Sequence, residues 1–233
     1  MSALPYRSAL IIGTGPGIGA AVARRLKAEG VTLALAARNT DKLADLAAET
    51  GAGLFAADAT QEAQVAKLFA DVEARIGVPE IVVYNVRGRI RGPLTDLVPR
   101  EVAEVIAASA FGGFLAVQQA ARRMIPQGKG AILLTGATAS IKGFANSAAY
   151  AMGKFALRGL AESAARELGP KGIHVAHIVI DGSVKSAERP EPADKPDGML
   201  APDAIAQSYI ALLRQPRSAW TSEIILRPWV ESF

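Results

Sequence analysis

The sequence contains no cysteine and only two histidines among its 233 residues. The absence of cysteine excludes disulfide bonds, thiolate nucleophiles and every metal site that needs a cysteine ligand. The two histidines, His174 and His177, lie on one expected strand with no further ligand at a suitable spacing, so we predict no metal site. A chain without cysteine is also compatible with the cytoplasmic location that we expect.

Long apolar runs and clusters of positive charge are absent as well. No unbroken run approaches the length of a membrane span, and residues 1–7 lack the apolar segment of a signal peptide, so we expect no membrane partner. Lys and Arg outnumber Asp and Glu by 26 to 22, but they are scattered, and aromatic residues make up only 6%. We therefore predict no nucleic-acid partner and a mild preference for small anionic ligands.

The hydrophobic residues, half of the chain, occur in short runs that alternate with helical patterns. The expected strands are 10–12, 31–37, 53–58, 81–85, 131–135, 173–180 and 223–226, and the longest helices are expected at 99–124 and 146–168. This alternation predicts one α/β domain over residues 1–233, with a seven-stranded parallel sheet covered by helices on both faces. Residues 181–198 are rich in proline and charge and have no apolar period, so we predict a substrate lid there.

A glycine-rich turn joins the first strand to the first helix. Gly13, Gly17 and Gly19 fit the pattern G-x-x-x-G-x-G, whereas Gly15, Gly17 and Ala20 fit G-x-G-x-x-A. Glycine lets the backbone approach a pyrophosphate, and the N–H groups and dipole of the helix favour an anion there. The pattern therefore predicts a dinucleotide site, and the alternative is a tight turn without a ligand.

Polar residues follow the second, third and fourth strands at the edge where ligands bind in parallel sheets. Arg38 stands where an NAD-binding protein would carry an acid, and a guanidinium there pairs with a 2′-phosphate, which favours NADP(H) over NAD(H). The alternative is an exposed arginine at a strand end. Asp58 is either a contact for the adenine amino group or a turn residue, and Asn85 ends the fourth strand.

Three arginines alternate in the loop after the fourth strand, at positions 87, 89 and 91. The simpler interpretation is a solvated basic loop. The other is that Arg87, beside the expected active site, grips an acidic group of a substrate.

The helix that follows the fifth strand carries Tyr150 and Lys154, four residues apart and therefore on one face. A tyrosine hydroxyl titrates near pH 10, and a neighbouring ammonium lowers its pKa into a useful range. Combined with the glycine turn, this Tyr-x-x-x-Lys pattern resembles the short-chain dehydrogenase/reductase family over nearly the whole chain. The resemblance implies a Rossmann-type, doubly wound fold.

The resemblance also implies roles for individual residues. Tyr150 is the expected catalytic acid and base, and Lys154 holds the nicotinamide ribose and lowers the tyrosine pKa. Asp181 to Ser186 stand in the place of the family's P-G-x-V-x-T segment at the nicotinamide carboxamide. The implied cofactor contacts are Gly13, Thr14, Gly15, Gly17, Ile18, Gly19, Arg38, Asp58, Ala59, Asn85, Tyr150, Lys154, Gly182, Val184 and Ser186.

The implied activity is an NADP(H)-dependent oxidoreductase that interconverts a carbonyl and an alcohol on a small-molecule substrate. Family likeness further implies a homodimer or homotetramer formed through the helices near 100–124 and 147–168.

The chain departs from the family pattern at several positions. The catalytic serine normally stands thirteen residues before the tyrosine, where this chain has Ala137, and we predict that Thr138 or else Ser140 takes its place. Ser109 aligns with the family's helix asparagine, and Asp181 replaces a proline. These departures leave open a second function, a catalytically weak NADP(H)-binding sensor or scaffold.

Overall fold

A computed structural model describes residues 3–230 and contains a seven-stranded sheet in the order β3-β2-β1-β4-β5-β6-β7. All six pairings are parallel, as the alternation of elements predicted. The strands are β1 (Ser8–Ile12), β2 (Thr32–Ala37), β3 (Gly53–Ala56), β4 (Ile81–Tyr84), β5 (Gly130–Thr135), β6 (Ile173–Ile180) and β7 (Glu223–Leu226). The helices are α1 (Ile18–Ala28), α2 (Ala44–Thr50), α3 (Glu62–Ile76), α4 (Pro99–Ile106), α5 (Gly112–Met124), α6 (Ala148–Leu168) and α7 (Pro202–Leu213).

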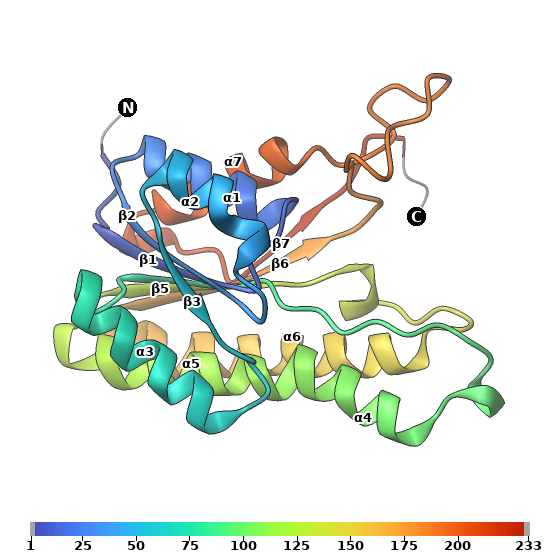
Figure 1. Cartoon of the computed structure of the whole chain (residues 1–233), viewed down its shortest axis with the longest axis horizontal. Coiled ribbons are helices and arrows are strands. Elements are labelled where there is room, and N and C mark those ends of the chain that lie inside the picture. The colour runs from blue at the N-terminus through green and yellow to red at the C-terminus, as the bar shows by residue number, and fades with distance from the viewer. Residues whose placement is uncertain (1–2, 231–233) are drawn as a thin grey trace.

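Helices cover both faces of the sheet, with α1, α2 and α7 on one side and α3, α5 and α6 on the other (Figure 1). Each face has its own core, because successive strand residues point to opposite sides. In β1, Ala9 and Ile11 pack in the first core, whereas Leu10 and Ile12 pack in the second. A strand buried on both faces must be apolar at every position, which is why these strands read as continuous apolar runs.

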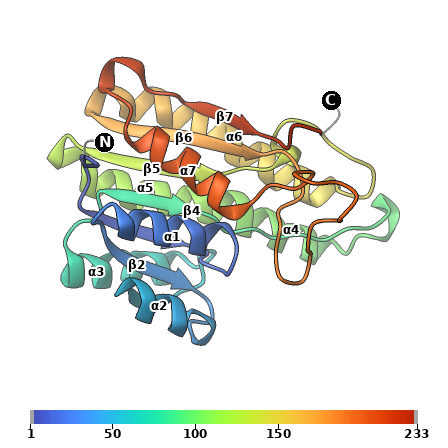
Figure 2. The same cartoon turned by 90° about the horizontal axis from the view of Figure 1, so that it is seen from above.

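The chain changes direction across the sheet at β1, which lies between β2 and β4. The helix after β1 covers one face, and the helices after β4 cover the other (Figure 1). The loops after these two strands therefore separate at the carboxyl edge of the sheet and leave a crevice there. Seen from above, residues 181–198 project beyond the same edge (Figure 2).

The helix expected over 99–124 is not a continuous α-helix. A π-helical turn at residues 107–111 separates α4 from α5. The Tyr84 hydroxyl, at the end of β4, donates a hydrogen bond of 2.6 Å to the Ala108 carbonyl inside this turn. Close packing accompanies the bond, since a Cβ on Gly112 would lie 2.4 Å from the Tyr84 oxygen. A π-helical turn inside a helix is frequently found at a functional site.

One helix start also differs from the prediction. The helix expected from residue 146 begins at Ala148, because Asn146 has a φ of 60° that an α-helix does not accept.

One helical stretch is long and apolar enough to cross a membrane by length and composition only. It is Pro99–Gln127, with 29 residues and a mean hydropathy of 1.3 in its most apolar window. Charged residues near both of its ends interrupt it, so it is not an unbroken apolar run. In the fold, residues of α5 including Leu115, Val117 and Met124 pack in the core beneath the sheet.

The Tyr84–Ala108 hydrogen bond gives a test of how the π-helical turn is held. Tyr84→Phe leaves a buried carbonyl without this donor, so we expect the free energy of unfolding in urea to fall by about 1–2 kcal/mol. Tyr6→Phe is the matched control, because Tyr6 is also a largely buried tyrosine but its hydroxyl makes no hydrogen bond within residues 3–230. Equal losses in the two variants would contradict a specific role for this bond.

Candidate active site

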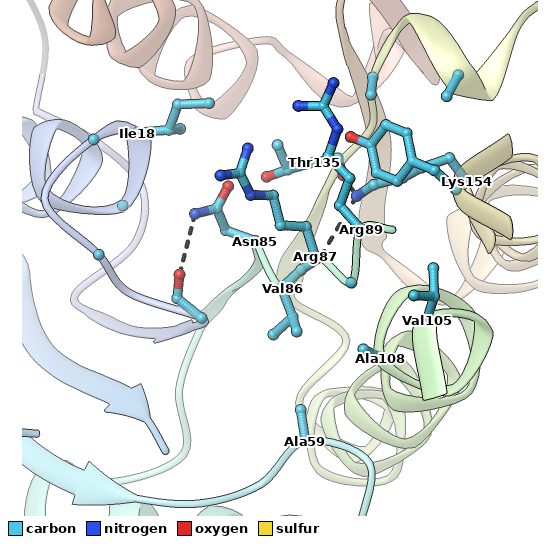
Figure 3. Close-up of a pocket in the computed structure, with 18 of the residues that line it drawn as sticks. Ile18, Ala59, Asn85, Val86, Arg87, Arg89, Val105, Ala108, Thr135 and Lys154 are labelled. Carbon is cyan, nitrogen blue, oxygen red and sulfur yellow. Dashed lines mark hydrogen bonds between the residues drawn. The ribbon is translucent and has the colours of Figure 1, made fainter. Parts of the chain in front are cut away.

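The glycine turn is tied to both neighbouring strands. Gly13 has a φ of +82°, which favours glycine, and a Cβ there would lie 2.7 Å from the Val86 nitrogen. Its N–H donates to the Ala36 carbonyl at 2.9 Å. Its own carbonyl accepts a bond of 3.1 Å from the Asn85 side-chain amide (Figure 3). The turn is thereby fixed between β2 and the end of β4.

The far side of the same turn is open. A Cβ on Gly15 or Gly17 would meet no atom within 4 Å. The helix α1 starts after Gly17, and no side chain within the described part of the chain caps its first turn. Free N–H groups, a helix dipole and an open glycine backbone together fit the pyrophosphate of a dinucleotide.

The expected adenosine end of the site lies at the ends of β2 and β3. Arg38 is exposed on the cleft wall, and no carboxylate among residues 3–230 forms an ion pair with it. The Asp58 carboxylate also lines the cleft, but its Oδ1 accepts hydrogen bonds from the Thr60 N–H and hydroxyl at 2.9 and 2.8 Å. Asp58 therefore shapes its turn, as one of the two interpretations predicted, and leaves its second oxygen for a ligand.

Lys154 is buried beneath the cleft and only 2% exposed. Its Nζ donates to the Thr135 carbonyl at 2.8 Å and, at 3.5 Å, to the Val86 carbonyl (Figure 3). Burial, together with repulsion from Arg87, lowers the pKa of Lys154 to about 7. The ammonium is therefore placed beside backbone oxygens that hold it, in a setting that weakens its charge.

Tyr150 lines the same cleft one helical turn away. Burial raises the pKa of the Tyr150 phenol above its ordinary value, and Arg87 and Arg89 partly offset this rise. The Arg89 guanidinium lies over the phenol ring, 5.6 Å from its centroid. Figure 3 shows Arg87 and Arg89 extending from one loop along the cleft. Arg87 and Arg89 are the cations that offset the effect of burial on the phenol pKa. The expected effect of Lys154 on that pKa stays a prediction.

The structure separates the two hydroxyls expected to replace the catalytic serine. Thr138 lines the cleft, and its hydroxyl acts on the Asp181 carboxylate and lowers its pKa. Ser140 is fully buried, is not among the lining residues, and accepts a bond of 3.1 Å from the Ala137 N–H. Ser140 thus stabilises the loop from inside and is out of contact with a ligand in the cleft.

Asp181, in the place of a family proline, is the centre of a small network. Arg227 donates to its carboxylate through Nε at 2.9 Å. Burial raises the pKa of Asp181, but the bonds from Thr138 and Arg227 outweigh burial and lower it below its usual value. The charged pair holds the start of the 181–198 segment against the end of β7, and the sequence analysis missed it because 46 residues separate the partners.

Two serines near Tyr150 and Lys154 have surroundings that the sequence alone did not predict. Ser109, in the π-helical turn, is completely buried, and its hydroxyl has no hydrogen-bond partner in the described chain. Ser147 lines the cleft three residues before Tyr150, on the same side of α6. A serine one turn before a tyrosine is a signal that the sequence offered.

The segment 181–198 folds back on itself beside the cleft. An isolated bridge pairs Val184 with Leu200, and Lys185 forms an ion pair of 2.6 Å with Glu191. Gly182 has a φ of +155°, and a Cβ there would lie 2.8 Å from Pro228. The segment therefore leaves the sheet edge through a fixed turn and borders the cleft, and its role as a lid stays a prediction.

A cleft of about 2170 Å³ lies at the carboxyl edge of the sheet. It is lined by every residue predicted to contact a cofactor, namely Gly13, Thr14, Gly15, Gly17, Ile18, Gly19, Arg38, Asp58, Ala59, Asn85, Tyr150, Lys154, Gly182, Val184 and Ser186. Among residues 3–230, no group of three or more His, Asp or Glu side chains is placed to hold a metal ion.

Comparison with known proteins identifies the family. The family model described as short chain dehydrogenase matches residues 7–192. The chain belongs to this family. An uncharacterized oxidoreductase of Staphylococcus aureus (strain N315) is 29% identical, with 98% of this chain and all of that protein covered. A short-chain dehydrogenase/reductase of Armillaria gallica is 32% identical over 77% of this chain and 72% of its own length.

Solved structures of short-chain dehydrogenases share the fold. One from Rhodopseudomonas palustris has 36% identity and a TM-score of 0.83, covering 96% of this chain and 99% of its own. A metagenomic short-chain oxidoreductase, solved in complex with NADP, has 30% identity and a TM-score of 0.85, covering 98% and 100%. The Rossmann-type fold, oxidoreductase family and NAD(P) cofactor class expected from the sequence are confirmed.

The buried Lys154 predicts a pH dependence of stability. Its pKa is about 7 in the folded protein and 10.5 as a reference for the unfolded chain. Between these values the unfolded chain binds more protons, so the free energy of unfolding rises with pH, by at most about 1.4 kcal/mol per pH unit. Below pH 7 both states are protonated and this contribution stays constant.

Urea unfolding between pH 7 and pH 10 checks this expectation. We expect Lys154→Met to lack the rise that the unchanged protein shows, whereas Lys27→Met, at an exposed position, keeps it. If all three proteins show the same slope, the pKa of Lys154 is not lowered by folding, and the expectation is wrong.

Proposed function

We propose that the protein is an NADP(H)-dependent oxidoreductase that interconverts a carbonyl and an alcohol on a small molecule. The observation that carries this proposal is that the Tyr150 phenol and the buried Lys154 ammonium share one cleft with the open glycine turn. A protein that only binds nucleotide needs no phenol at this point. The NADP complex of the related metagenomic oxidoreductase supports the cofactor.

In the proposed reaction a bound nicotinamide supplies or accepts the hydride, and this chain moves the proton. The Tyr150 hydroxyl donates its proton to the substrate oxygen during reduction and takes it back during oxidation. The phenolate left after donation is stabilised by Arg87 and Arg89. Lys154, held by the Thr135 carbonyl, would hold the ribose of the cofactor.

A second hydroxyl for the substrate oxygen comes from Thr138 or Ser147 in this proposal. The Thr138 hydroxyl acts on the Asp181 carboxylate, so in this proposal it accepts a hydrogen bond from an alcohol more readily than it donates one to a carbonyl. Ser147 lines the cleft and makes no side-chain hydrogen bond within the described residues, so its proton is available.

The second candidate is a catalytically weak NADP(H)-binding sensor or scaffold. The observation that favours it is the combination of Ala137 at the serine position with a Thr138 hydroxyl that acts on the Asp181 carboxylate. This candidate predicts tight nucleotide binding without turnover.

We also propose that the chain assembles as a homodimer or homotetramer. Phe111 and Phe114 are exposed and stacked, with ring centroids 6.2 Å apart, and Met152 and Phe155 are exposed on the adjacent helix α6. A contiguous apolar surface of this kind is typical of protein interfaces.

Arg38 tests the cofactor preference. We expect Arg38→Ala to weaken NADPH binding about 10- to 100-fold, because it removes a charge-assisted pair with the 2′-phosphate, and to leave NADH binding unchanged. Nicotinamide fluorescence titrations measure both affinities, with Arg25→Ala as the control outside the cleft. A parallel loss for both nucleotides would contradict the assignment.

Tyr150 separates the enzyme from the sensor. We expect Tyr150→Phe to lower kcat at least about 100-fold in NADPH oxidation assays with aldehydes and ketones, while the NADPH Kd stays within a few-fold. An unaltered kcat would remove Tyr150 from the mechanism. NADPH binding by the unchanged protein, with no turnover of any carbonyl tested, would favour the sensor.

A further inference from the structure

Four arginines from two separate segments meet at the Tyr150 end of the cleft. Arg87, Arg89 and Arg91 come from the loop after β4, and Arg189 comes from the 181–198 segment. All four line the cleft and are exposed. Burial and the charges of Arg91, Arg87 and Arg189 lower the pKa of Arg89, so each of the other three guanidinium groups acts on Arg89.

This arginine cluster is not neutralised within the protein. No Asp or Glu carboxylate among residues 3–230 forms an ion pair with any of its members. Three carboxylates also line the cleft, on Glu101 and Glu104 of α4 and on Glu188 beside Arg189. Glu104 is paired with Arg100, and none of the three forms an ion pair with the cluster. Like charges held together without counter-ions raise the energy of the site until an anion binds.

The loop that carries Arg87, Arg89 and Arg91 is held in place at Gly88 and at Gly92. A Cβ on Gly88 would lie 2.8 Å from the Val105 Cα, so the backbone packs directly on α4. Gly92 donates its N–H to the Asn146 carbonyl at 3.2 Å. Between these anchors Arg89 lies over the Tyr150 ring, 5.6 Å from its centroid. The charge is therefore built into the reacting end of the cleft and is not a feature of a free loop.

The phosphates of the proposed cofactor belong elsewhere in the cleft. The open glycine backbone at Gly15 and Gly17 fits the pyrophosphate, and Arg38 at the end of β2 fits the 2′-phosphate. The arginine cluster lies at neither of these positions. It lies beside Tyr150, where the reacting molecule would bind.

We infer that the substrate carries a carboxylate, which pairs with Arg89, Arg91 and Arg189 while its carbonyl or alcohol oxygen meets Tyr150. This inference rests on the proposed oxidoreductase function and names its substrate class, a compact keto acid or hydroxy acid. Arginine presents a planar pair of N–H donors that matches a carboxylate. Because Arg189 lies in the 181–198 segment, the bound carboxylate also joins that segment to the loop after β4.

Matched acid and ester probes test the inference without knowledge of the natural substrate. The probes are 3-formylbenzoate and 4-oxopentanoate, each beside its methyl ester, which keeps the carbonyl and removes the charge. Their Kd values are measured by calorimetry with the protein alone and with NADPH present, and kcat/KM is measured for each probe that is turned over. We expect at least one acid to bind about 10-fold or more tightly than its ester.

Substitutions of the arginines test whether these residues cause the preference for the acid over its ester. Arg89→Gln, Arg91→Gln and Arg189→Gln should each lower the acid-to-ester ratio about 10-fold, whereas a loss of catalysis alone would reduce both probes equally. Arg25→Gln, an exposed arginine on α1 outside the cleft, is the matched control and should keep the ratio. Added salt should weaken the acid and not the ester.

The outcomes distinguish this inference from the function on which it rests. Acid and ester bound equally, or a ratio unchanged in all three glutamine variants, overturns the carboxylate assignment even when carbonyls are reduced. An arginine-dependent preference for the acid in a protein that does not bind NADPH retains the anion site and overturns the oxidoreductase proposal.

Discussion

The parallel pairing of the strands is the constraint on which the site depends. Because all seven strands run in one direction, their carboxyl ends meet at a single edge. The loops that follow β1, β4 and β5 therefore converge, and the Asn85 bond to Gly13 and the Lys154 bond to Thr135 fix their mutual positions. Two helix layers bury both faces, so the edge is where polar side chains can gather without crossing the core.

Electrostatics at this edge is dominated by cations. The exposed guanidinium groups of Arg87 and Arg89 act on the phenol of Tyr150, and Arg87 also acts on the buried ammonium of Lys154. Burial and Arg87 lower the pKa of Lys154, which reduces its positive charge near neutral pH. The arginines add positive charge beside the phenol, and the same charge makes the cleft favourable for an anion.

Local patterns predicted the fold and most of the cleft. Apolar runs indicated each strand, and the glycine turn and the Tyr150–Lys154 spacing indicated the dinucleotide site, because these signals depend on near neighbours in the chain. Contacts between distant residues were beyond such patterns. The π-helical turn depends on Tyr84, 24 residues before Ala108. Asp181 is held by the distant Arg227, and Thr138 acts on the same carboxylate. Burial of Ser140 likewise follows from tertiary packing.

A crystal structure of the protein with NADPH tests the central claim most directly, namely that this edge is one continuous cofactor and substrate cleft. The account predicts the pyrophosphate over Gly15 and Gly17, the 2′-phosphate against Arg38, and the nicotinamide beside Tyr150 and Lys154. It also predicts that the arginine cluster remains beside the nicotinamide, clear of the cofactor phosphates. A nucleotide bound in the opposite direction, or with its phosphates on Arg89 and Arg91, would contradict it.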